Sequence, residues 1–136
     1  MNVKPERVAV EILLVAAAGF CAYVLPVALD PGTRHYDAAV LPFVRDAVEG
    51  MKAYSLVLLF GVGVLIGVLG RAPVWLTGPA TMAALPVWSA LDMALGGSHN
   101  LFPIEWFLYG LFSLCGLAGA VAGRRLRAKR TGEAVP

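Results

Sequence analysis

The chain has 136 residues, of which 59% are hydrophobic and 15% are charged. A soluble globular domain is about half apolar and about one quarter charged. The formal net charge is only +2, and the charged residues collect at the two ends and in one connecting segment. This composition excludes an ordinary soluble domain and indicates a protein of the lipid bilayer.

Four apolar segments are each long enough to cross a membrane, since a spanning helix needs about 20 residues at about 1.5 Å of rise per residue. We predict an all-α integral membrane protein, a four-transmembrane-helix bundle in one domain, because lipid cannot satisfy the polar groups of any open backbone. A cleaved signal peptide is the alternative for the first segment, although Glu11 interrupts it and Phe20 stands where a small residue would precede Cys21. The expected helices are residues 8–29, 53–69, 73–95 and 101–122.

Residues 123–136 form a basic tail, whereas the connection between the third and fourth segments has no Lys or Arg. Basic residues stay on the cytoplasmic side, so we expect both termini in the cytoplasm and the chain in a bacterial or archaeal plasma membrane. Two interpretations of the tail are a topology anchor that also touches anionic lipid and a nucleic-acid-binding segment. We expect the anchor and no nucleic-acid partner. Its basic residues are Arg124, Arg125, Arg127, Lys129 and Arg130.

Residues 38–52, in the first connection, have apolar residues at helical spacing. We predict a short amphipathic helix lying on the outer surface, with Pro42 near its start. The expected apolar face contains Val40, Phe43, Val44, Ala47, Val48 and Met51, and the expected polar face contains Arg45, Asp46, Glu49 and Lys52.

Glycines recur at intervals of three and four in the second and fourth expected helices. Small residues at this spacing let helix backbones approach closely, which is the main packing device in lipid. The glycines serve either packing within one bundle or the formation of a homo-oligomer. They are Gly63, Gly67 and Gly70 in one helix and Gly116, Gly119 and Gly123 in the other.

Ionisable residues inside a membrane are costly, so each is a candidate for function. We expect Glu11 to reach the interface or to pair with Arg7 one turn earlier. If the two glycine faces meet, an outer cluster is expected at the mouth of the bundle. This cluster is either a structural clamp or a site for a proton, cation or polar ligand. Its expected members are Lys52, Asp92, His99 and Glu105.

No motif of a hydrolase, metalloprotease, nucleotide-binding or dinucleotide-binding enzyme is present in the sequence. We therefore expect a non-enzymatic structural or accessory subunit without a cofactor or a metal. Its partners would be the lipid bilayer, a second copy or a larger membrane complex. The alternative is a small transporter or channel for a proton, cation or small polar ligand, acting through the outer carboxylates.

Overall fold

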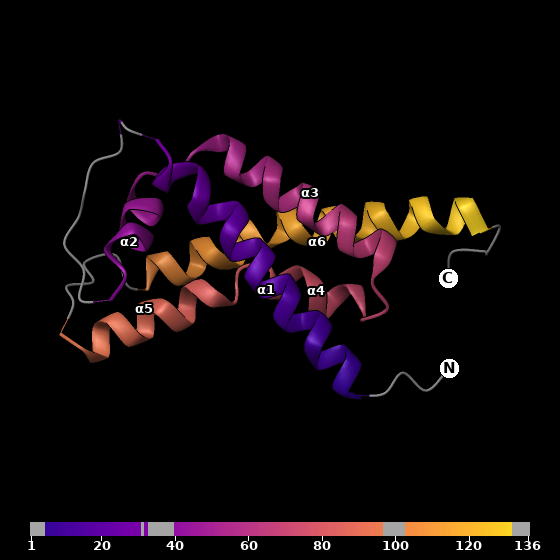
Figure 1. Ribbon diagram of the computed structural model, residues 1–136, viewed down its shortest axis with the longest axis horizontal. Helices are drawn as coiled ribbons and strands as arrows, with labels where there is room; N and C mark the ends of the chain where they lie inside the picture. Colours follow the sequence, from indigo (N-terminus) through magenta and orange to yellow (C-terminus); the bar gives the residue numbers. More distant parts are fainter. Residues whose placement is uncertain (1–4, 31, 33–39, 97–102, 132–136) are drawn as a thin grey trace.

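The computed structural model describes residues 5–30, 32, 40–96 and 103–131, and within these ranges every regular element is a helix. The all-α class is therefore confirmed. Figure 1 shows the six helices: α1 (Pro5–Ala28), α2 (Pro42–Glu49), α3 (Ala53–Leu69), α4 (Val74–Ala80), α5 (Ala84–Ala94) and α6 (Ile104–Thr131).

Two of these helices, α1 and α6, are long and apolar enough to cross a membrane. Helices α2 and α3 qualify together as a third segment, although their axes are bent by 104° at the short break between them. The start of α1 and the end of α6 lie at the same end of the molecule (Figure 1). The structure thus supports a membrane protein with two spanning helices, or three when the bent pair is counted as one.

The expected helix over residues 73–95 is divided into α4 and α5 by a turn at residues 81–83. Pro86 explains the division, because its ring would clash with the carbonyl of Met82 if one helix continued. At its place in the first turn of α5, Pro86 needs no N–H. The turn keeps its backbone bonded, since the N–H groups of Thr81, Met82 and Ala83 each donate to the carbonyl three residues earlier.

Helices α3 and α6 run parallel and touch backbone to backbone. A Cβ atom at Gly63 would collide with the carbonyl oxygen of Gly116, and one at Gly67 would collide with that of Ala120. Gly119 and Gly123 meet the carbonyls of Phe60 and Val64 in the same way. The two glycine faces therefore meet within one chain, as the bundle interpretation expects.

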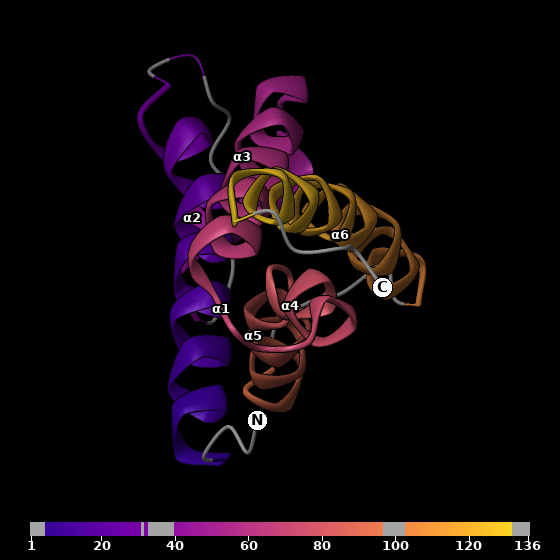
Figure 2. The ribbon, with the colours of Figure 1, turned by 90° about the vertical axis from the view of Figure 1, so that its right-hand side faces the viewer.

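Helix α6 lies between α3 on one side and α4 on the other, while α1 crosses the group at a steep inclination (Figure 2). The turn after α4 is wedged between α1 and α6, because Gly19 packs on the carbonyl of Thr81 and Gly116 on its side chain. Near the C-terminal end of α1, the Tyr54 hydroxyl of α3 donates a hydrogen bond to the Pro26 carbonyl oxygen, with 3.2 Å between the two oxygens.

The close contact between α3 and α6 predicts opposite effects on stability for two glycine substitutions in α3. Gly63→Ala should destabilise the bundle by about 1–3 kcal/mol, because the added methyl group forces α3 and α6 apart. Gly61→Ala is the matched control: nothing lies within 4 Å of its Cβ position, so the change should stabilise α3 by about 0.5–1 kcal/mol. Unfolding in mixed micelles measures both, and equal effects of the two variants would contradict the interface.

Candidate functional site

Two carboxylates of the expected outer cluster, Asp92 and Glu105, are almost completely buried, with 0% and 1% of their surface exposed. Asp92 is in the last turn of α5, and Glu105 is in the first turn of α6. Ser89 lies one turn before Asp92 on α5 and approaches Glu105, with 3.4 Å between its Oγ and Oε2 of Glu105. The two carboxylates thus belong to one buried group at the end of the bundle opposite the start of α1 and the end of α6.

Asp92 fixes the segment that leads into α2. Its Oδ1 accepts the backbone N–H of Val40 at 2.8 Å, and Nε1 of Trp88 donates to the carbonyl oxygen of Val40 at 2.6 Å. Both polar groups of one peptide residue are therefore held by side chains of α5. The next residue, Leu41, has a φ of 49°, a left-handed conformation that costs a non-glycine residue about 1–2 kcal/mol. The two hydrogen bonds that hold the Val40 backbone offset this strain.

Glu105 is held by hydroxyl groups rather than by Lys52. The hydroxyls of Ser89 and Tyr109 each lie 3.4 Å from its Oε2, and the indole N–H of Trp106 donates to Ser89. A carboxylate in the first turn also suits the positive end of the helix dipole. The arrangement therefore links α5 to α6 through Ser89.

Helix α2 brings a cation and a further carboxylate into this region. Arg45 is 8% exposed and Asp46 is 4% exposed, whereas Phe43 is 41% exposed. Nη2 of Arg45 pairs with Oε1 of Glu49 at 2.8 Å. The expectation of an outer helix that keeps Arg45 and Asp46 on a solvated face is wrong, because α2 packs against α1 and carries both residues inward.

Lys52 does not join the carboxylates. Its Nζ lies 3.0 Å from Oδ2 of Asp30, in a pair that is about one third exposed, so the expected meeting of Lys52 with Glu105 is wrong. The physical reason is that Lys52 precedes α3 at the bend from α2, beside Asp30 just after the end of α1. His99 lies outside the described residues.

We name the outer polar cluster as Asp92, Glu105, Ser89, Arg45 and Asp46. The cavity beside Glu105 is small, about 60 Å³, and its other lining residues are mostly apolar or aromatic. Such a volume suits about two water molecules. No three His, Cys, Asp or Glu side chains within the described ranges come together as a metal site would require.

Helical spacing alone places Ser89 beside Asp92. No comparable signal marks Arg45 or Asp46, because their burial depends on the docking of α2 against α1, which local periodicity does not encode.

Glu11 forms a second polar centre at the opposite end of the bundle. Its Oε1 accepts the backbone N–H groups of Arg71 and Ala72 at 2.9 and 3.0 Å, and its Oε2 accepts that of Arg71 at 3.0 Å. From α6, Arg124 donates to the carbonyl oxygen of Ala72, and Arg127 donates to that of Gly70 at 2.9 Å. The loop of residues 70–73 is therefore held from both sides.

This loop corrects two expectations from the sequence. Glu11 engages backbone N–H groups across the bundle rather than Arg7. Gly70 does not continue the packing stripe with α6, since a Cβ atom there would meet the Glu11 carboxylate. Glycine is required at this position because the carboxylate and the backbone approach each other closely.

Removal of the Asp92 acceptor should release α2 while leaving the bundle folded. In Asp92→Ala, the buried N–H of Val40 loses its partner, at a cost of about 1–3 kcal/mol. Amide hydrogen exchange over residues 40–49 should accelerate, and exchange in α3 and α6 should stay slow. Asp92→Asn is the control, because its amide oxygen still accepts the N–H. Equal exchange in the Ala and Asn variants would refute the hydrogen bond's role.

The ion pair between Lys52 and Asp30 predicts how the pKa of Asp30 responds when Lys52 is replaced. The backbone N–H of Gly32 and then Lys52 lower the pKa of Asp30, and Asp30 raises the pKa of Lys52. Lys52→Gln should raise the pKa of Asp30, yet leave it below the ordinary value because the Gly32 hydrogen bond, 2.9 Å long, remains. An NMR titration of the Asp30 carboxyl measures this.

The lowered pKa of Asp30 also fixes the direction of the pH dependence. The stabilisation is present above the ordinary carboxyl pKa and is lost as the pH falls through the lowered one. An Asp30 pKa that Lys52→Gln leaves unchanged would contradict the ion pair.

Comparisons with protein-family models, curated proteins and solved structures found no match for this chain. The site is therefore defined by its own geometry. That geometry is a buried outer polar cluster without a sizeable cavity, and a loop held by charged side chains at the other end of the bundle.

Proposed function

We propose that this chain is a four-pass membrane protein that acts as a non-enzymatic structural or accessory subunit, with both termini in the cytoplasm. The passes are α1, α3, the divided pair α4–α5, and α6, and α2 lies outside the second pass, at the start of α3. The bonded turn between α4 and α5 supports the third pass, because lipid tolerates a broken helix only where its backbone groups find partners. The basic end of α6 supports the orientation.

The observation that carries the structural interpretation is how the two outer carboxylates are used. Asp92 holds the backbone of Val40, and Glu105 accepts from Ser89 and Tyr109, so both bind the chain's own groups. Small-molecule sites usually occupy about 300–1,000 Å³. The cavity of about 60 Å³ beside Glu105 is far smaller, which weighs against a site for a small polar molecule, while the engagement of both carboxylates by the chain's own groups favours a clamp over an ion site.

The glycine contacts bear on how such a subunit would assemble. Because the glycine faces of α3 and α6 are covered by each other, a partner or a second copy would bind a different surface. Large apolar side chains remain exposed on α1 and on the far side of α6, among them Leu13, Phe107 and Leu114. In a bilayer these faces meet lipid or another membrane helix.

The decisive experiment compares wild type and Glu105→Gln in proteoliposomes. The glutamine keeps an oxygen acceptor for Ser89 and Tyr109, so the variant should remain folded, as judged by its elution and thermal transition in detergent. Neither protein should conduct protons or potassium ions above the lipid background. A flux carried by the wild type and lost in folded Glu105→Gln would refute the structural role and establish transport.

Thiol labelling tests the passes and their direction. After Cys21→Ala and Cys115→Ala, a membrane-impermeant maleimide should label Ala94→Cys in intact spheroplasts, because position 94 ends α5 on the outer side. Lys129→Cys, on the basic end of α6, should react only after permeabilisation. Both positions are exposed, so access depends on the membrane alone. Labelling of Lys129→Cys in intact cells, or protection of Ala94→Cys, would overturn this topology.

A further inference from the structure

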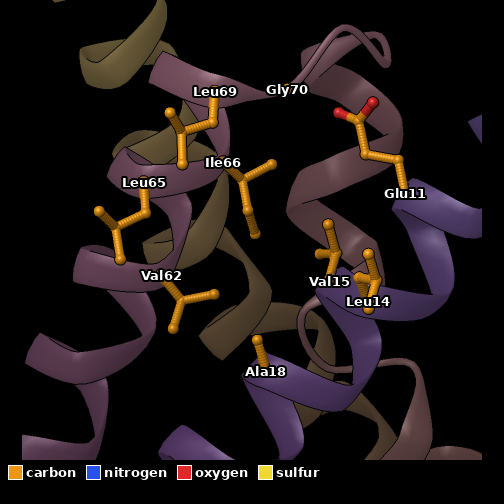
Figure 3. Close-up of a pocket in the computed structure, with 9 residues that line it drawn as sticks. All are labelled: Glu11, Leu14, Val15, Ala18, Val62, Leu65, Ile66, Leu69 and Gly70. Atoms are coloured by element: carbon orange, nitrogen blue, oxygen red, sulfur yellow. The ribbon is translucent and has the colours of Figure 1, made fainter.

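A laterally open groove of about 470 Å³ runs between α1 and α3 near the basic end of the molecule (Figure 3). Its walls are almost entirely apolar, and Leu14 and Leu69 at its edges are 66% and 77% exposed, so it faces the lipid. The wall residues of α1 are Leu14, Val15 and Ala18, and those of α3 include Val62, Ile66 and Leu69.

The end of the groove toward the chain termini is polar. The Glu11 carboxylate and Gly70 close it, and Glu11 is already bound to the backbone of Arg71 and Ala72 (Figure 3). The apolar channel thus stops where the charged loop begins. A ligand that fits must be apolar along its length and polar at this end.

The length of the groove suits an acyl chain in one leaflet of a bilayer. From Val62 to Leu69 the groove follows eight residues of α3, which rise by about 10 Å at about 1.5 Å per residue. Most of one leaflet of a bilayer is therefore covered, since half the hydrocarbon core is about 15 Å.

Charge decides the kind of headgroup. Arg71 directly follows Gly70 and is exposed, and Arg7 is exposed one turn before Glu11 on the same face of α1. The described residues at this end carry an excess of positive charge. The carboxylates are Glu6 and Glu11, whereas the cations are Arg7, Arg71, Arg124, Arg125, Arg127, Lys129 and Arg130.

We propose that this groove binds one anionic phospholipid from the leaflet at the basic end of the bundle. One acyl chain lies between α1 and α3, and the phosphate lies beside the guanidinium groups of Arg71 and Arg7. The apolar walls take the chain, and each nearby Arg adds about 1 kcal/mol of attraction for an anionic surface, or about fivefold in affinity.

The test is native mass spectrometry of the full chain in detergent with added phosphatidylglycerol or phosphatidylcholine of the same acyl chains. Wild type should retain one phosphatidylglycerol with at least about fivefold preference over phosphatidylcholine. Arg71→Gln should lower this preference about fivefold, because it removes a cation but keeps the backbone N–H that Glu11 binds. Arg125→Gln, an exposed arginine of α6, is its control. Equal retention of the two lipids by wild type would overturn the proposal.

Filling the groove tests the acyl-chain position. Ala18→Phe should abolish retention of the bound lipid, whereas Ala17→Phe should preserve it, because Ala17 is exposed on the same helix but does not line the groove. Elution in detergent reports whether each variant is folded. If Ala18→Phe does not fold, the result for Arg71→Gln tests the proposal instead. Equal lipid loss in both phenylalanine variants would overturn the proposal. So would a dimer that only Ala18→Phe dissociates, which would make the groove a seat for a second copy.

Discussion

The backbone contact between α3 and α6 is the constraint on which the rest of the structure depends. Where the hydrophobic effect cannot draw helices together, close approach of backbones provides the dispersion contacts that hold a bundle. Gly63 and Gly67 reach α6, and Gly119 and Gly123 reach α3. Because the two helices run parallel, another element must carry the chain back between them, and α4 and α5 do so.

The contact also positions the groups at both ends. With α6 fixed against α3, Glu105 at one end of α6 meets Ser89, while Arg124 and Arg127 near the other end reach the loop that follows α3. Polar groups withdrawn from water need partners, and the side chains of Asp92, Glu11 and Arg124 find theirs on backbone atoms. The charged side chains therefore serve mainly to join elements that the apolar packing leaves loosely placed.

The sequence predicts the helical class and the ends of α3, because long apolar runs bounded by Gly, Pro and charge leave little choice. It also predicts that Gly63, Gly67, Gly119 and Gly123 pack between α3 and α6, whereas Gly70 lies against Glu11 and Gly116 lies against Thr81. The division of the third segment is consistent with Pro86. The sequence does not predict it, because a proline alone does not show whether a helix is kinked or broken.

The outer polar cluster was only partly predictable from the sequence. Asp92 and Glu105 stand out as carboxylates in apolar surroundings, whereas Lys52 pairs with Asp30 and Arg45 is buried. Both of these outcomes depend on the bend between α2 and α3, which arises from tertiary packing and not from local periodicity.

The loop of residues 70–73 has a consequence for the order of assembly. Its N–H groups are bound by Glu11, from the first helix, and its carbonyls by Arg124 and Arg127, from the last. During translation, Glu11 is therefore made long before Arg124 and Arg127. The carbonyl groups of Gly70 and Ala72 therefore lack these partners until the part of α6 that contains Arg124 and Arg127 has been made.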